Sequence, residues 1–234
     1  MRIAEMNWPE VAKQVEADTR CILPIGSTEQ HAQLSLSVDS ILAERVSVEA
    51  AAPLGVPVFP VMPYGLAPYF SAYPGTVTLR VETLLAVVRD VVTSMARGGF
   101  RRILIVSGHG GNSPVGALCS ELMMEDPRLS IKFHEWWKAP KTFAKVQEIG
   151  PGGSHANWME NFPWTRLTHA PAPDGEKAPL DMVKFKAGPP GAGRELLGDG
   201  SFGSVYQKPD EAMNALWQVG VSETREVLEG PWGV

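Results

Sequence analysis

The chain has 234 residues, a formal net charge of −5 and two cysteines. This length predicts one domain that buries a core without a disulfide framework, and the acidic balance argues against nucleic acid or an anionic membrane as the main partner. The N-terminal residues show no apolar signal segment, and the uncharged stretch 50–79 contains too many prolines for a membrane helix. We therefore expect a cytoplasmic protein in which Cys21 and Cys119 are reduced and buried.

Apolar residues recur along the chain either at helical spacing or in short β-branched runs, and the two patterns alternate. In chain order they predict a helix within 1–18 that is entered at Asn7-Trp8-Pro9, a strand at 20–25, a helix at 40–52, a proline-rich strand end or edge strand at 56–62, a helix at 81–98, a strand at 102–107, a helix at 114–124, a strand at 129–135 and a helix at 209–228. This alternation favours an α/β fold with a mostly parallel central sheet, and we expect residues 1–234 to form a single domain.

The segment 170–204 is rich in glycine and proline. Such a composition fits a flexible linker, but apolar residues at 180–185 and 196–197 interrupt it. We therefore predict an ordered arm or loop that packs on a neighbouring subunit or over the functional site.

Two polar segments with histidine follow predicted strands, which is where open α/β sheets place their sites. In the first, Glu29 and His31 point the same way if the segment is extended, and Asp39 can return to them through the loop. Oxygen and nitrogen donors of this kind suit Zn²⁺, Mn²⁺ or Fe²⁺. The alternative interpretation is a plain turn in which Asp39 caps the following helix.

In the second segment, glycines flank His109, which lets a ligand approach the backbone closely; the alternative is a turn needed only for tight packing. A third segment holds His155 and Glu160, which are five positions apart and therefore not on one helical face. They converge only if a loop leads into a helix between them, and otherwise His155 is a solvated side chain. We expect His134 to be a structural histidine and His169 to be exposed.

Taken together, the strings LPIGSTEQH, PGTVTLRVETL, GFRRILIVSGHGGN and SHANWMEN resemble the creatininase (creatinine amidohydrolase) family from about Leu23 to Glu160. The resemblance implies a three-layer αβα metal-dependent hydrolase that forms a homo-oligomer, often a hexamer, and holds one or two divalent ions (Zn, Mn or Fe). Carried over position by position, the implied metal ligands are Glu29, His31, Asp39, His109 and Glu160, with Asp39 as the bridging carboxylate. His155 matches the histidine that handles protons in that family.

The chain departs from the family pattern at four places. The segment 31–39 lacks a second histidine and is one residue shorter than usual. Tyr69 and Phe70 stand where a Glu-His pair is frequent, Gly111 replaces a glutamate of the creatinine-hydrolysing members, and Asn157 stands where glycine is common. These replacements leave the implied ligands in place and make the pocket less suited to creatinine.

The resemblance implies hydrolysis by metal-activated water, with His155 protonating the leaving group. The expected pocket residues are Tyr69, Phe70, Gly110, Gly111 and Trp158, and the two glycines offer N–H groups to an oxyanion. Our leading prediction is a hydrolase that opens a small cyclic or linear amide. The alternative is hydrolysis of a cyclic ketone or lactone from cyclitol or carbohydrate breakdown, and a third hypothesis is a metal- or sugar-binding module without catalysis.

Overall fold

Three parallel strands form the central sheet of this protein. The computed structural model describes residues 1–233, and in it β1 (Arg20–Ile25), β2 (Arg102–Ser107) and β3 (Ser130–Glu135) pair in the order β1-β2-β3. In their register, Arg20 lies opposite Arg102, which in turn lies opposite Ser130. β1 and β2 are buried except at their first residue, as expected for parallel strands that are covered on both faces, and β3 contains both buried and half-buried residues.

The proline-rich segment 56–62 runs along the free side of β1. It forms only isolated parallel bridges, between Ile22 and Val58 and between Ile25 and Met62. Proline lacks a backbone N–H, so a segment with prolines at positions 57 and 60 cannot form a continuous ladder. The segment thus lies at the edge of the sheet, as predicted, but it pairs with β1 only at isolated positions and does not form a continuous strand.

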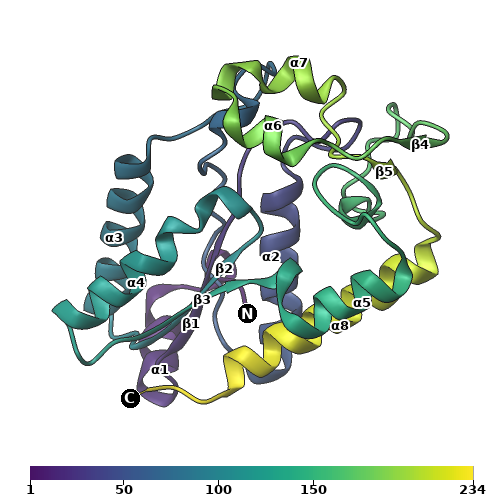
Figure 1. The fold of residues 1–234 in the computed structure, drawn as a ribbon. Helices are drawn as coiled ribbons and strands as arrows, with labels where there is room; N and C mark the ends of the chain where they lie inside the picture. The colour runs from purple at the N-terminus through teal and green to yellow at the C-terminus, as the bar shows by residue number, and fades with distance from the viewer. Residues whose placement is uncertain (234) are drawn as a thin grey trace.

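Helices cover both faces of the sheet, as Figure 1 shows. On one face lie α1 (Trp8–Ala17), α3 (Val81–Arg97) and α4 (Pro114–Glu125), and on the other lie α2 (Val38–Ala51), α5 (Pro140–Ile149) and α8 (Asp210–Glu229). Within residues 1–233, no helix combines the length and the apolar character that a membrane span requires. The layers confirm the predicted αβα architecture.

Strand side chains alternate between two hydrophobic clusters. Leu23 and Ile105 join the cluster under α3 and α4, together with the free cysteines Cys21 and Cys119. Leu104 points the other way and packs with residues of α2 and α8. This alternation follows from the two-residue period of a strand, and it holds the carboxyl ends of β1 and β2 in a fixed position.

The first helix begins at Trp8, at the entry that Asn7-Trp8-Pro9 predicts. Asn7 caps it, because the Asn7 side chain accepts a hydrogen bond from Glu10 N at 3.1 Å, while Asn7 N donates to Glu10 Oε2 at 2.8 Å. This reciprocal cap fixes the point at which the helix begins, and the residues before it form only a short 3-10 turn. The other predicted helices match the observed ones to within a few residues.

The glycine-rich arm is ordered and folds back over its own chain. It contains β4 (Glu176–Lys177), α6 (Met182–Ala187), α7 (Gly193–Leu197) and β5 (Ser204–Val205), with β4 and β5 paired antiparallel. Phe185 and Leu197 are buried against Ala67 and Phe70. In Figure 1 the arm lies at the top of the view, above α2. The arm therefore packs on the loop that precedes α3.

His134 of β3 is buried, and its Nε2 lies 3.1 Å from Thr224 Oγ1 of α8, as expected for a structural histidine. Burial lowers the pKa of His134 to about 4, with a smaller opposing effect from Glu223. Between pH 4 and 6.5 the unfolded chain therefore binds more protons than the native state, so acidification destabilises the fold. We expect a loss of about 2 kcal/mol between pH 7 and pH 5 from this group.

Urea unfolding of wild type and His134→Gln at both pH values measures this loss. Glutamine keeps a partner for Thr224 but does not titrate, so the free energy of unfolding of the variant should fall less on acidification. Equal pH dependence of the two proteins would show that His134 does not contribute.

Candidate metal centre

The structure brings the five expected ligand side chains together at the carboxyl ends of β1 and β2. They are Glu29, His31, Asp39, His109 and Glu160. The first two lie in the loop after β1, Asp39 lies in the first turn of α2, His109 directly follows β2, and Glu160 ends the 3-10 turn Trp158–Glu160. Parallel strands deliver their following loops to one edge of a sheet, which explains this convergence.

Asp39 lies at the middle of the cluster. Its Oδ1 is 3.2 Å from His31 Nε2, and its Oδ2 is 3.0 Å from His109 Nδ1. Ser27 Oγ also donates to Oδ2 at 2.6 Å. The N-cap of α2 is Ser37, so the alternative in which Asp39 only caps the helix is wrong.

The ligand atoms form two groups that share Asp39. In one group, Glu29 Oε1 lies 3.2 Å from His109 Nδ1, and in the other, His31 Nε2 lies 3.5 Å from Glu160 Oε2. Within each group, one ligand atom per residue lies within 4.8 Å of the others. This arrangement offers two neighbouring positions for a cation, each with two carboxylates and one imidazole.

Backbone carbonyls fix the orientation of both histidines. His109 Nε2 lies 2.7 Å from Leu66 O, and His31 Nδ1 lies 3.1 Å from Glu29 O. A carbonyl only accepts, so these nitrogens carry the protons of the neutral rings. The opposite nitrogens then present lone pairs to the carboxylates, which is unfavourable unless a cation or a proton lies between them. Metal-binding histidines are oriented by partners of this kind.

Glu29 supplies a further sign that the cluster fits a metal ion. Its side chain is fully buried, and neither carboxylate oxygen has a hydrogen-bond partner within residues 1–233. Burial raises the pKa of Glu29. A buried carboxylate without a hydrogen bond is costly, and a coordinated cation removes that cost. The donor set of oxygen and imidazole nitrogen suits Zn²⁺, Mn²⁺ or Fe²⁺.

The electrostatics of the cluster also favour positive charge at its centre. Burial lowers the pKa of His31, but the carboxylates of Asp39 and Glu160 outweigh this effect and raise it to about 10. Burial raises the pKa of Glu160 to about 7. The pKa of Asp39 is lowered despite burial, because His31 and His109 face it. Three carboxylates in one buried cluster need compensating charge, which divalent cations can supply.

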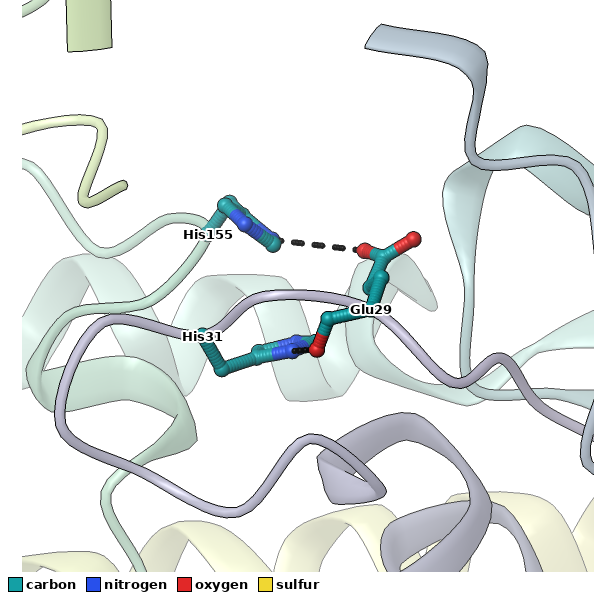
Figure 2. Close-up of side chains that lie close together, drawn as sticks. All are labelled: Glu29, His31 and His155. Carbon is teal, nitrogen blue, oxygen red and sulfur yellow. Dashed lines mark hydrogen bonds and ion pairs between the residues drawn. The ribbon is translucent and has the colours of Figure 1, made fainter. Parts of the chain in front are cut away.

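His155 lies beside the cluster, and Figure 2 shows it with Glu29 and His31. Its Nδ1 is 3.8 Å from Glu29 Oε1 and 3.9 Å from Glu160 Oε2. The side chain is only 13% exposed, so the alternative of a solvated histidine is wrong. Burial lowers the pKa of His155 well below its usual value, and the nearby His31 adds to this effect. The ring is therefore neutral near pH 7.

The loop after His155 explains how the chain brings His155 and Glu160 together. Ala156 adopts φ of 56°, and its N–H donates to Glu160 Oε2 at 2.6 Å. Asn157 Nδ2 donates to Gly152 O and to Gly203 O, each at 2.7 Å. Asn157, which departs from the family pattern, thus joins this loop to the arm.

The expected pocket residues fall into different surroundings. Phe70 stacks on His155 with ring centroids 4.5 Å apart, and Tyr69 packs on Phe185 at 5.1 Å. Gly110 is exposed next to His109. Trp158 does not line a pocket, because its ring is fully buried in the core cluster, where it contacts Gly153. The 3-10 turn points this indole away from the cluster.

Three further side chains lie near the site, and none of them is among the ligand or pocket residues expected from the sequence. Gln30 Nε2 lies 2.8 Å from His155 Nε2, Phe202 lies 4.9 Å from the His155 ring, and Trp137 lies beside Gly110. Gln30 stands between two expected ligands in the sequence, so its place near the cluster could be predicted. Its contact with His155 could not. Phe202 belongs to the arm. Nothing in the sequence around it predicts its contact with His155, because the two residues lie far apart along the chain.

Gly111 has no room for a side chain. A Cβ there would lie 1.9 Å from Leu66 O and 2.4 Å from His109 Nε2, the two atoms whose contact orients His109. We therefore expect Gly111→Ala to lower metal affinity by about 10–100-fold, the usual cost of losing such a supporting contact. Gly110→Ala is the matched control, because its Cβ would meet only Trp137 at 3.5 Å.

Competition with a chromogenic chelator measures both affinities. The control should bind metal as wild type does. Equal affinity for Gly111→Ala and Gly110→Ala would contradict the proposed role of the contact between Leu66 and His109.

Known proteins resemble this chain in sequence and in fold. The family model "Creatininase: Creatinine amidohydrolase" matches residues 4–226. Creatinine amidohydrolase of Pseudomonas putida is 29% identical over 164 residues, which are 64% of this chain and 63% of that protein. The 3-dehydro-scyllo-inosose hydrolase of Thermotoga maritima is 26% identical over 149 residues, covering 62% of this chain and 48% of that protein. The chain thus spans less than two thirds of the length of these curated relatives.

Solved structures share the fold over nearly the whole chain. A creatininase mutant complexed with creatine superposes with a TM-score of 0.81 at 23% identity, and the match covers 97% of each chain. A creatininase Mn form has a TM-score of 0.76 at 22% identity and covers 97% of each chain. A Zn-Zn type of a creatininase mutant has the same TM-score and identity, 0.76 and 22%, and covers 97% of this chain and 96% of that chain. Since the family model extends over nearly the whole sequence, this chain belongs to the creatininase family.

Proposed function

We propose that this protein is a metal-dependent hydrolase that holds two divalent ions and opens the C–N bond of a small cyclic or linear amide. The observation that carries the proposal is the carboxylate of Asp39, whose two oxygens each face a different group of ligands. When bound, such ions polarise a carbonyl oxygen and lower the pKa of water. Membership of a family of hydrolases supports the same conclusion.

The residues divide into two sets around Asp39. Glu29 and His109 complete one set, and His31 and Glu160 complete the other. Zn or Mn is favoured, because structures of related fold include a Zn-Zn type and a Mn form. Fe²⁺ suits the same donor atoms.

His155 is the proposed catalytic residue. It is neutral near pH 7, and its Nδ1 faces the carboxylates of Glu29 and Glu160 across less than 4 Å. A substrate bound there receives a hydrogen bond from this ring on its oxygen or on its leaving nitrogen. The N–H groups of Gly110 and Gly111 are the proposed donors to a developing oxyanion.

The walls beside His155 favour an uncharged substrate. Phe70 and Phe202 contact the His155 ring, and Tyr69 and Phe185 pack behind them. Apolar walls with few polar groups are typical of sites for small organic molecules.

A second candidate function is hydrolysis of a cyclic ketone or lactone. It is favoured by the similarity to an inosose hydrolase and by Phe70, which offers no hydrogen bond to a leaving nitrogen. The third hypothesis, a binding module without catalysis, does not account for His155 beside the ligand cluster.

Metal content and reaction products test these proposals. Elemental analysis after reconstitution with Zn, Mn or Fe should give about two ions per chain. Screening cyclic amides, lactones and cyclitol ketones should then yield an amine for amide cleavage, whereas the second candidate yields only an acid. Bound metal without turnover of any of these would favour the binding module, and no bound metal would refute the metal centre itself.

Chelation should destabilise the protein measurably. At a free metal concentration of about 100 times Kd, each bound ion adds about 2.7 kcal/mol to the free energy of unfolding. For a chain of this size, that corresponds to a rise in Tm of roughly 5–10 °C. Thermal unfolding with and without chelator measures the difference, and an unchanged Tm would contradict metal binding.

We also propose a homo-oligomer, such as a hexamer. Support comes from the resemblance to the creatininase family, which implies an oligomer. Light scattering coupled to size-exclusion chromatography measures the assembly, and a mass of one chain would refute it.

A further inference from the structure

Gln30 connects three distant parts of the chain beside the metal cluster. It lies in the loop between the expected ligands Glu29 and His31, and it is almost fully buried. Its Nε2 donates to Gly200 O of the arm at 3.0 Å and lies 2.8 Å from His155 Nε2. Its Oε1 accepts from Ala32 N at 3.2 Å. Gln30 is not one of the expected metal ligands, so its buried hydrogen bonds serve another purpose.

The hydrogen bonds leave the amide of Gln30 only one orientation. Oε1 faces the N–H of Ala32, which can only donate, and Nε2 faces the carbonyl of Gly200, which can only accept. Rotating the amide by half a turn would set oxygen against oxygen and nitrogen against nitrogen. The second hydrogen of Nε2 is therefore directed at His155.

This orientation decides which nitrogen of His155 carries the proton. Because the Gln30 amide donates to Nε2, that nitrogen must present its lone pair. The proton of the neutral ring is then on Nδ1, which faces Glu29 and Glu160 at 3.8 and 3.9 Å. His155 thus offers a donor, not an acceptor, to whatever binds next to the cluster.

Aromatic contacts hold the ring in the plane that this hydrogen bond needs. Phe70 stacks on His155 with an interplanar angle of 9°, and Phe202 contacts it at 4.9 Å. The backbone of Phe202 also donates to His155 O at 3.1 Å. The arm therefore contacts both Gln30 and His155.

We propose that Gln30 is a positioning residue, held by Gly200 of the arm, that keeps the His155 proton on Nδ1 and so presents a hydrogen-bond donor to the substrate. The group that the substrate places against His155 must then be an acceptor, such as a carbonyl oxygen, and not a protonated amine. The consequence for catalysis rests on the proposed function of His155, whereas the position of the proton does not.

The position of the proton can be measured directly. In protein labelled with [15N]histidine, two-bond ¹H–¹⁵N correlation spectra distinguish a protonated ring nitrogen from one with a lone pair, and a His155→Asn variant assigns the signals. We expect wild type to show a protonated Nδ1 and a hydrogen-bonded, unprotonated Nε2, both without metal and after loading with Zn²⁺. A proton on Nε2 in both forms would overturn the proposal.

Two variants remove the contact by different routes. Gln30→Met keeps the length of the side chain but removes the donor, and Gly200→Ala would place a Cβ 1.6 Å from Gln30 Oε1 and so displace the amide. In both, we expect the His155 nitrogen signals to move toward values averaged over the two tautomers. Unchanged His155 signals in both variants would show that Gln30 does not hold the proton.

Gln147→Met, on the exposed surface of α5, is the matched control and should leave the His155 signals as in wild type. Metal content should stay the same in all variants, because the expected ligands are intact. If the hydrolase assay identifies a substrate, kcat should fall by about 10–100-fold in Gln30→Met, with a smaller effect on KM. If wild type shows no turnover, the proposed function fails, while the spectra still decide the role of Gln30.

Discussion

Asp39→Asn should reduce the metal bound per chain from about two ions to one or none, the loss expected where one carboxylate bridges two sites. The amide keeps only one oxygen, although the two oxygens of Asp39 face His31 and His109 separately. Its NH₂ group would donate to one of these imidazole lone pairs and satisfy it without a metal. We therefore expect affinity at that site to fall by more than about 100-fold, beyond the effect of losing a supporting contact.

Elemental analysis after dialysis against a weak chelator measures this effect. Asp90→Asn, on the exposed surface of α3, makes the same chemical change away from the cluster and should retain all bound metal. If Asp39→Asn keeps as much metal as Asp90→Asn, Asp39 does not link the two sites.

Glu29→Gln should stabilise the metal-free protein while abolishing its stabilisation by metal. The wild-type carboxylate is fully buried and has no hydrogen-bond partner within residues 1–233, whereas an amide can donate to His109 Nδ1, 3.2 Å from the present Oε1. Burial raises the pKa of Glu29 and so disfavours its charged form, and a neutral amide that gains a hydrogen bond avoids a cost of about 1 kcal/mol or more. For a chain of this size, that gain raises Tm by roughly 2–4 °C.

Thermal unfolding of both proteins, with chelator and with excess Zn²⁺ or Mn²⁺, separates the two effects. Glu5→Gln is an exposed control that should behave as wild type under both conditions. A metal-free Glu29→Gln that melts below wild type would mean that the carboxylate is stabilised by the fold alone, and the case for a cation at this residue would be lost.

The fold could be predicted from the sequence because its strands are buried on both faces. A run such as 102–107 is almost wholly apolar, and only a covered parallel strand accommodates it. The start of α1 is signalled in the sequence by Asn7-Trp8-Pro9, whereas the residues before Asn7 within the range 1–18 form only a short 3-10 turn. The expected ligands follow strand ends, where topology rather than sequence distance brings residues together.

The rest of the site depends on contacts that no local pattern encodes. Trp158 stands between two site residues in the sequence, but a 3-10 turn directs its ring into the core. Gln30 meets Gly200 across 170 positions of chain, and Phe202 reaches His155 only because the arm folds back. Such contacts arise from tertiary packing, which a single sequence does not reveal.

In this fold, the side chains that would bind ions and the aromatic side chains that surround His155 come from different parts of the chain. The groups that hold charge come from the ends of the sheet and from the 3-10 turn at Glu160, whereas Phe185 and Phe202, which enclose His155 and Phe70, come from a segment outside the layered core. The part of the arm that precedes Gly200 can therefore diverge in sequence without disturbing the ion-binding groups, whereas Gly200 itself is held by its contact with Gln30. Variation confined to 180–197 offers a route, in evolution or in the laboratory, by which the proposed hydrolytic centre acquires new substrates.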